Sequence, residues 1–435
     1  MIKSLNMDDG GSERERPVRR LRATVCVAGG GPAGMMAGLL FARAGIDVIV
    51  LEKHADFLRD FRGDTVHPST LEVLEDLGLV ERFFERPHQK IKRVRVRFGG
   101  ETFIVGDFTK LRTRYPYIAL IPQWDFLDLL AKEAKTYPSF ELLMPAKVTD
   151  LIEADGRVRG VRALTSGEEL EIRSELVIGA DGRHSTVRGR ARLLVNEIGA
   201  PIDVLWMRLS REPSDPSQLY GIFDRGEALV MIDRGQYFQC GYLIEKGALE
   251  RIRKKGLPWF QERILSLAPF LGSRVAELKS WDDIKLLNVQ INRLRRWWRP
   301  GLLCIGDAAH AMSPVGGVGV NLAIQDAVAA ANILIDPLLK GELSARHLRA
   351  VQKRRTLPVV LTQKFQEIAQ RKVIGHALSV QQRAPAPWFF RVLNRWPALR
   401  RLPAWWIGFG VRPERVRARR PDFIRASPQV SAGLQ

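Results

Sequence analysis

The 435-residue chain has few cysteines and no long hydrophobic run. Three cysteines, Cys26, Cys240 and Cys304, cannot make an even disulfide framework, and buried thiols usually serve as small apolar fillers. No 18 consecutive residues are apolar, and the first 24 residues include Glu and Arg without the apolar core of a secretory signal. These absences predict a cytoplasmic protein in a reducing compartment, without a membrane span.

Acidic residues are too few to balance the basic ones, which leaves a formal net charge of +20. The excess is uneven, because residues 383–425 contain eleven Arg against Glu414 and Asp422. The rest of the chain is only mildly basic, and it has no zinc-ligand spacing, RNP motif or helix-turn-helix pattern. We therefore expect no nucleic-acid partner.

A strand, a glycine turn and a helix are predicted near the start of the chain. The apolar residues 24–28 lead into Gly29-x-Gly31-x-x-Gly34, and Pro32 suits a first helical turn. Such glycines permit a tight turn and a close approach of the backbone to a pyrophosphate, which the helix N-terminus attracts. Glu52 follows the next strand, where a carboxylate can accept a bond from a ribose hydroxyl. The pattern predicts a bound adenine dinucleotide.

Two further strand ends carry an aspartate next to a glycine. Residues 176–180 lead into Asp181-Gly182-Arg183, with Arg188 downstream, and such strand ends commonly bind ligands in α/β sheets. The alternative is a turn in which Asp181 caps a helix. Residues 302–305 lead into Gly306-Asp307, whose carboxylate can bind polyol hydroxyls. The glycine-rich stretch 314–321 then begins a helix whose N-terminus would stabilise the negative charge of a reduced flavin.

Together, these three motifs resemble the FAD-dependent aromatic hydroxylase family (group A flavoprotein monooxygenases, of which para-hydroxybenzoate hydroxylase is the type). The resemblance covers residues 24 to about 335. It implies Glu52 on the adenosine ribose, Arg62 and Gln123 along the ribityl-phosphate path, Asp181 and Arg188 where NAD(P)H and the pyrophosphate pass, Asp307 on the ribityl chain and Pro314 to Asn321 at the ring. Many relatives have Arg at the position of Gln123. The complete set of cofactor-binding residues expected by similarity is Gly29, Gly31, Pro32, Ala33, Gly34, Glu52, Lys53, Arg62, Gly63, Gln123, Asp181, Arg188, Gly306, Asp307, Pro314, Gly317, Gly319, Val320 and Asn321.

The expected fold is α/β, with a Rossmann-like FAD-binding domain, an inserted antiparallel β substrate domain and a helical C-terminal region. Period-two apolar spacing in 94–105 and short strands in 202–245 place the insertion. The expected domains are a flexible lead (1–23), a discontinuous FAD-binding domain (24–91, 122–190 and 297–340), a substrate-binding domain (92–121 and 191–296) and a basic helical region (341–435). An S-x-x-E pattern at Ser69 and Glu72 predicts a capping box.

The activity that the resemblance implies is hydroxylation of an aromatic, polyketide-like or quinone-type small molecule. NAD(P)H would reduce FAD, and O₂ would then give a flavin C4a-hydroperoxide that transfers oxygen to the substrate. No second glycine fingerprint occurs, so NAD(P)H would be a transient co-substrate. An FAD-dependent reductase of the geranylgeranyl-reductase type, without oxygen insertion, is the main alternative. A flavin-binding or tetracycline-sequestering protein is another. A halogenase is disfavoured because no Trp-x-Trp-x-Ile-Pro stretch is present.

No catalytic side chain and no metal site is predicted from the sequence. His310 is interpreted as a histidine bonded within its turn, whereas His67 remains open between a structural and a site role. Four large side chains on the expected substrate strands suit the core better than the pocket: Tyr220, Met231, Phe238 and Tyr242.

The C-terminal stretch 388–396 allows two interpretations. Its apolar residues fall on one helical face, with Arg391 and Arg395 opposite, which is typical of helices at membrane surfaces. The alternative is a helix packed on the substrate domain with its arginines exposed, and Pro397 and Pro403 favour this by interrupting the pattern. A peripheral membrane contact of this Trp-rich basic region is therefore left open.

Overall fold

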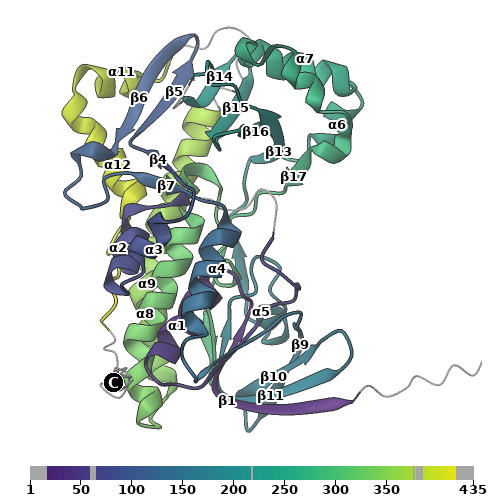
Figure 1. The fold of residues 1–435 in the computed structure, drawn as a ribbon, viewed down its shortest axis with the longest axis vertical. Helices are drawn as coiled ribbons and strands as arrows, with labels where there is room; N and C mark the ends of the chain where they lie inside the picture. Colours follow the sequence, from purple (N-terminus) through teal and green to yellow (C-terminus); the bar gives the residue numbers. More distant parts are fainter. Residues whose placement is uncertain (1–16, 59–64, 217–218, 376–377, 379–385, 418–435) are drawn as a thin grey trace, which may run out of the picture.

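The computed structural model describes residues 17–58, 65–216, 219–375, 378 and 386–417. Two bodies, each built around a β-sheet, lie at opposite ends of an elongated molecule, and the long helices α8 and α9 run along its length (Figure 1). The fold is α/β with a second, mostly antiparallel sheet, which confirms the fold class expected from the sequence.

The first sheet has eight strands, and its main path runs β19-β20-β11-β1-β2-β8. Pairing is parallel from β20 to β8, while β19 and the β9–β10 hairpin are antiparallel additions. Its strands are β1 (Val18–Ala28), β2 (Val48–Leu51), β8 (Phe140–Leu143), β9 (Lys147–Ala154), β10 (Arg157–Leu164), β11 (Glu169–Gly179), β19 (Trp298–Arg299) and β20 (Leu302–Cys304). Strand β1 begins at Val18, earlier than expected, because residues 18–23 pair with the outer half of β11.

Two of the longer helices of this body, α1 and α8, are mostly buried. Helix α1 packs against both α8 and α4. The segment Val315–Leu339 is long and apolar enough to cross a membrane, but 72% of its apolar window is buried inside the protein, as in a core helix. The bounds are α1 (Pro32–Arg43), α2 (Pro68–Asp76), α3 (Val80–Phe84), α4 (Gln123–Ala134), α5 (Thr186–Arg190), α8 (Gly319–Leu339) and α9 (Ala345–Ala369).

Helix starts agree only partly with the sequence. Pro32 occupies the first turn of α1, as expected. The capping box predicted at Ser69 and Glu72 is wrong, because α2 begins one residue earlier at Pro68, with His67 as its N-cap. Glu72 instead accepts bonds from Thr113 and from Arg415, which lies far away in the sequence.

The second sheet has seven strands in the order β17-β13-β16-β15-β14-β5-β6. All its pairings are antiparallel except that of β14 with β5. The strands are β5 (Arg93–Phe98), β6 (Glu101–Asp107), β13 (Ile202–Ser210), β14 (Leu219–Asp224), β15 (Glu227–Asp233), β16 (Tyr237–Glu245) and β17 (Lys285–Leu287). Helices α6 (Leu249–Arg253) and α7 (Leu257–Leu267) lie beside this sheet, and α7 contacts β14 and β15.

The remaining elements are two small sheets and several short helices. A three-stranded sheet has the order β3-β7-β4, and β12 pairs with β18. Helices α11 and α12 both contact β6 at the outer side of the second sheet (Figure 1). The bounds are β3 (Thr65–Val66), β4 (Gln89–Ile91), β7 (Ile118–Leu120), β12 (Val195–Glu197), β18 (Asn292–Leu294), α11 (Trp388–Arg395), α12 (Arg401–Gly408), η1 (Phe108–Lys110), η2 (Pro269–Glu277), η3 (Trp281–Asp283), η4 (Gly306–Ala308), η5 (Val315–Gly317), η6 (Gln370–Gly375) and η7 (Pro397–Arg400).

Candidate cofactor site

Four neighbouring parallel strands of the first sheet end at the same level. Ala28 of β1 pairs with Leu51 of β2 on one side and with Gly179 of β11 on the other, and Gly179 pairs with Cys304 of β20. The residues that follow these four strands therefore emerge along one edge, at the carboxyl ends, where α/β sheets bind ligands. This register brings together the three motifs that the sequence presents separately.

The glycine turn after β1 is packed against its neighbours at two positions and open at the third. A β-carbon at Gly29 or at Gly34 would collide with backbone, with the carbonyl of Ala180 in the first case and that of Gly29 in the second. A β-carbon at Gly31 would meet nothing within 4 Å. Gly31 is also the N-cap of α1, where backbone N–H groups are unpaired. The open side of Gly31 thus lies at the N-terminus of α1, a position that suits a pyrophosphate.

Glu52 lies directly beside this turn. Its Oε2 accepts a hydrogen bond from the Gly30 N–H at 2.9 Å, and Oε1 accepts one from the His54 N–H at 3.1 Å. These contacts hold the carboxylate next to the glycine turn, and its bond to a ribose hydroxyl stays a prediction.

Asp181 makes the contacts of the helix-cap alternative. Its carboxylate accepts hydrogen bonds from the Ser185 hydroxyl and, at 3.1 Å, from the Val187 N–H at the start of α5. Burial raises the pKa of Asp181, and the bond from Ser185 opposes that effect. A direct contact of Asp181 with a cofactor remains a prediction, since both oxygens already have partners in the protein.

Arg188 and Arg183 connect the loops that follow β11 and β20. The Arg188 guanidinium donates to the Ala308 carbonyl at 3.2 Å and to the Arg183 carbonyl at 2.6 Å. The Arg183 guanidinium lies 3.8 Å from the Asp307 carboxylate. The Asp307 side chain is 35% exposed, so this carboxylate remains accessible to a polyol.

A buried aspartate that the sequence analysis overlooked, Asp326, is bonded to the backbone of the Gly306-Asp307 turn. Asp326, on α8, accepts a bond from the Gly306 N–H at 3.0 Å and lies 2.6 Å from His310 Nε2. Its other oxygen accepts from Arg355 Nε at 2.8 Å. Burial opposes ionisation of Asp326, but His310 and then Arg355 outweigh it and hold its pKa below the usual value. His310 is therefore bonded to Asp326 of α8, a structural role, but not within its own turn as the sequence analysis expected.

The glycine-rich turn before α8 is tied to the loop that precedes α2. Thr65 Oγ1 donates to the Gly317 carbonyl at 2.8 Å. Asn321 Oδ1 accepts from the His67 N–H at 2.9 Å and from Thr70 Oγ1 at 2.7 Å, and its amide nitrogen donates to the carbonyls of Thr65 and Gly317. The Asn321 side chain thus holds the turn in place, while the backbone at the start of α8 provides the donors for an anion.

The remaining predicted residues occupy several different elements, and two of them fall outside the described residues. Lys53 is exposed after β2, Gln123 is the first residue of α4, and Gly319 begins α8 at a point where a β-carbon would meet nothing within 4 Å. Ala33 lies under Gly306, and Val320 packs against the main core. Pro314 is the N-cap of η5. Arg62 and Gly63 fall outside the described residues, so their role stays a prediction.

The two faces of the second sheet pack in different apolar clusters. Met231, Phe238 and Tyr242 are buried in the core that includes α7, which confirms the core interpretation. The alternate positions on the opposite face include Trp206, which packs in the same apolar clusters as Val230. Val315 of the glycine-rich turn packs in the larger of these clusters. The side chain of Tyr220 lies outside what the structure describes.

Trp206 carries an indole N–H on this face. Its indole Nε1 is buried and has no hydrogen-bond partner among the described residues. A buried N–H without an acceptor is costly, so a donor of this kind often marks a place for a ligand. The strict alternation of side chains along β13 could have revealed this face, because even-numbered positions point away from the α6–α7 side. Within the described ranges, no three His, Cys, Asp or Glu side chains are grouped to hold a metal.

Comparison with known proteins agrees with this geometry. Residues 22–363 match the model of an FAD-binding domain. The chain is 36% identical to 6-methylpretetramide 4-monooxygenase of Streptomyces rimosus over 78% of its own length and 81% of that protein's. It is 25% identical to digeranylgeranylglycerophospholipid reductase of Methanothrix thermoacetophila, over 77% and 83% of the two lengths.

A solved structure shows the same fold at low identity. The p-nitrophenol 4-monooxygenase PnpA from Pseudomonas putida superposes with a TM-score of 0.73 and 21% identity, covering 89% of this chain and 97% of that one. Its likeness is one of fold, whereas the match to the family model and the 36% identity carry the assignment. The chain belongs to the family of FAD-dependent aromatic hydroxylases.

Proposed function

We propose that this protein is an NAD(P)H- and O₂-dependent monooxygenase that hydroxylates a polycyclic, polyketide-like aromatic molecule. The observation that carries the proposal is the common level at which β2, β1, β11 and β20 end, since it aligns Glu52, the glycine turn and Asp307 in one row. The substrate class rests on the similarity to a monooxygenase named for 6-methylpretetramide.

The residues along this row fit an extended FAD. Glu52 would bind the adenosine ribose, the open side of Gly31 would face the pyrophosphate, and Asp307 would hold the ribityl hydroxyls. The N-terminus of α8 would then lie at the ring, where its dipole favours the negative charge of the reduced state. Bound FAD supplies the acceptance of a hydride from NAD(P)H and the activation of O₂.

The chain itself positions the reactants and limits water. The overall reaction converts substrate–H, O₂, NAD(P)H and a proton into substrate–OH, NAD(P)⁺ and water. The apolar side chains that gather around Val315 and the inner face of the second sheet exclude bulk water from the ring end of the row. Arg183 and Arg188 connect the loops after β11 and β20 and so position both sides of the site.

The substrate would lie against the face of the second sheet that carries Trp206. The inner sheet face presents Trp206, Val230 and Leu243, which suit a flat apolar molecule. The indole N–H of Trp206 would donate to a keto or phenolic oxygen, of which polycyclic polyketides carry many.

Replacing Trp206 by Phe keeps a ring on the sheet and removes only the donor. We expect KM to rise by about five-fold, the value of one hydrogen bond, with FAD content unchanged. Steady-state kinetics with a hydroxylated polycyclic substrate would measure this. The matched control is Trp281→Phe, on the other side of the second sheet beside Phe260, for which KM should not change. Equal effects of both substitutions would contradict the assigned substrate position.

The proposed reaction is tested by following the flavin absorbance and the fate of oxygen. NADH or NADPH should bleach the purified yellow protein without O₂, and faster when an aromatic polyketide is present. Readmitting isotopically labelled O₂ should place one labelled oxygen atom in the product. Reduction of a substrate double bond without O₂ consumption would instead establish the reductase alternative. A flavin that neither NADH nor NADPH bleaches, with any compound of the panel, would indicate a binding protein.

A further inference from the structure

The outer surface formed by α9, α11 and α12 carries an unusual share of the exposed apolar side chains. Those of α9 are Leu357, Phe365 and Ile368, and those of α11, its end and α12 are Trp388 (75% exposed), Trp396 (58%), Leu402 (57%) and Trp405 (45%). We call these seven residues the tryptophan surface. Phe365 of α9 contacts Trp406 of α12 with ring centroids 5.6 Å apart, so these two helices meet at this surface.

These side chains are exposed although the helices that carry them are packed. The apolar side of α11 is used internally, because Phe390 is buried against Phe98 and Phe103 of the second sheet. Ala404 of α12 is likewise buried, in a cluster with Phe108. One side of each helix therefore packs on the protein, while Trp388, Trp396 and Trp405 remain exposed.

The segment that carries α11 and α12 is rich in arginine. Seven Arg lie between residues 388 and 417, against a single acidic residue, Glu414, which is buried beside Arg354. Arg391, Arg395 and Arg401 are exposed and make no ion pair within the described part of the chain. The partner that complements this surface must be apolar and negatively charged at once.

The geometry points to an anionic phospholipid surface as that partner: we propose that the tryptophan surface and its arginines hold the protein on a membrane. Tryptophan is the side chain most suited to the boundary between headgroups and acyl chains, and arginine binds the phosphates of the headgroups. A second copy of this chain would present the same positive charge and would be repelled. Residues 418–435 carry three Arg against one Asp, so they do not complement this surface either. The proposal concerns the exposed side of α9, α11 and α12 and does not depend on which reaction occurs at the cofactor row.

The test uses the full-length, FAD-loaded protein and sedimentation with two kinds of vesicle. One is phosphatidylcholine alone, and the other is an equimolar mixture of phosphatidylcholine and phosphatidylglycerol. We expect binding to the mixed vesicles that weakens as salt is added, and much weaker binding to the neutral ones. Arg391→Gln and Arg395→Gln should each lower partitioning by about five-fold, and Trp388→Ser and Trp405→Ser should lower it further when combined.

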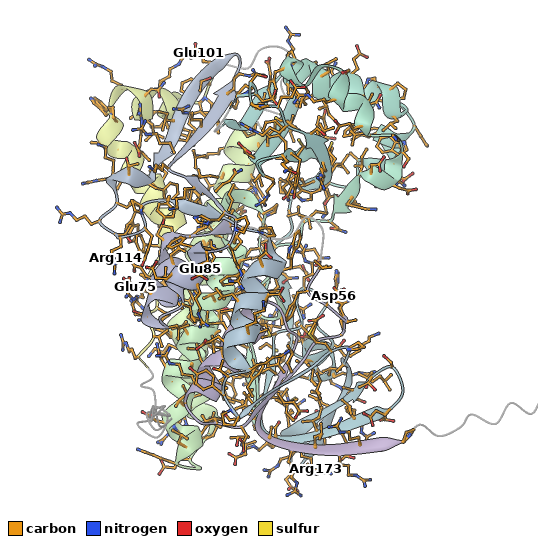
Figure 2. The ribbon with its side chains drawn as sticks, viewed as in Figure 1. Asp56, Glu75, Glu85, Glu101, Arg114 and Arg173 are labelled. Carbon is orange, nitrogen blue, oxygen red and sulfur yellow. The ribbon has the colours of Figure 1, made fainter. Side chains whose placement is uncertain are left out.

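Matched controls lie elsewhere on the molecule. Leu194 is 65% exposed outside the tryptophan surface, and Arg173 is an exposed residue of β11 at the end of the molecule opposite to Glu101 and the β5–β6 hairpin (Figure 2). Leu194→Ser and Arg173→Gln should leave partitioning unchanged. All variants should retain the flavin absorbance, which separates lost binding from misfolding. The proposal is overturned by absent vesicle binding, by controls that lose as much as the tryptophan variants, or by self-association in light scattering without vesicle binding.

Discussion

At the scale of single residues, the three glycines of the first motif have different tasks. Gly29 and Gly34 are fixed by neighbouring backbone, and Gly29 has a φ of 106°, which side chains other than glycine rarely adopt. Gly31 is the one of the three at which a side chain would enter open space. Substitutions at these positions should therefore separate folding from cofactor binding.

Replacing Gly31 by Val should give a folded protein that lacks FAD. The β-carbon would meet nothing within 4 Å, so the valine side chain should obstruct the proposed pyrophosphate position and spare the fold. Circular dichroism and the ratio of flavin to protein absorbance measure the two effects. Gly34→Val is the comparison, since its side chain would collide with Gly29 and the protein should fail to fold. A yellow, fully loaded Gly31→Val protein would show that the cofactor has been misplaced.

His67 should make stability depend on pH. Burial lowers the pKa of His67 from 6.5 to about 4, and the bond between its Nδ1 and the Ile407 carbonyl offsets part of this effect. Since the unfolded chain binds a proton more readily than the folded one, stability is complete above about pH 6.5 and is lost as the pH falls toward 4. The loss should reach roughly 3 kcal/mol.

Chemical denaturation at several pH values between 4 and 7 would measure this loss. His67→Gln is the control, because an amide can still donate to the Ile407 carbonyl but takes up no proton. Subtracting its profile removes the contribution of the carboxylates. Identical slopes for the two proteins would rule out His67 as the source.

The sequence predicted local conformation best where the turn or helix start restricts the residue type, and the cofactor roles of these residues stay predictions. Gly31 and Pro32 could be placed because turns and helix starts restrict the residue type. The roles of Asp181, Asn321 and Asp326 depend on which partners the fold brings to them, and those partners lie up to 256 positions away in the chain. Arg62 and Gly63 lie outside the described residues, and no structural observation bears on them.

At the scale of elements, the helix α9 joins the cofactor turn to the end of the described chain. Arg355 on α9 bonds to Asp326 beneath the Gly306-Asp307 turn and lies 3.7 Å from Glu414. Glu414 also accepts from Arg354 Nε at 2.5 Å, and its N–H donates to Gln325. The segment after α12 therefore contributes a buried carboxylate to the support of the cofactor site.

Glu414→Gln should destabilise the protein by roughly 2–3 kcal/mol. The substitution keeps the size of the side chain but leaves the buried Arg355 with one carboxylate instead of two. The estimate is below that for a fully buried pair, because Arg354 is 35% exposed. Denaturant titration would measure it. Glu250→Gln, whose pair with Arg253 lies at the surface, should change the free energy of unfolding very little.

Elements with a buried apolar run or a regular alternation of apolar and polar residues could be predicted from the sequence, and elements without either could not. The buried apolar runs of β2 and β20 and the alternation in β13 and β15 identified both sheets. The early start of β1 was missed, because residues 18–23 are mostly basic and exposed and lack the buried apolar run of β2 or β20, while their pairing with β11 is not visible in the sequence. Residues 409–417 have no periodicity, and long-range partners such as Asp76, which bonds to Arg415, fix their path.

At the scale of the whole molecule, FAD should act as a stabilising element. The proposed row draws on segments that begin at residues 29, 52, 181 and 306, so a bound dinucleotide would join parts that are distant in the sequence. Binding to the folded state alone adds stability by mass action.

Removal of FAD should lower the melting temperature by a few degrees, and adding FAD back should restore it. A hundredfold excess over Kd adds about 2.7 kcal/mol to the free energy of unfolding. Differential scanning fluorimetry across a series of FAD concentrations would show the rise. Gly31→Val protein should show none, and a similar rise in that variant would place FAD elsewhere.

The contact between Glu414 and Arg355 also bears on when the cofactor can bind during synthesis of the protein. The glycine turn, Asp181 and Gly306 leave the ribosome in turn, and each can pair its strand with the ones already made. The carboxylate that completes the charge balance under the last of these turns comes more than a hundred residues later. Full-affinity loading of the cofactor is therefore expected only after translation has passed this point, so nascent chains arrested before residue 414 should capture FAD weakly.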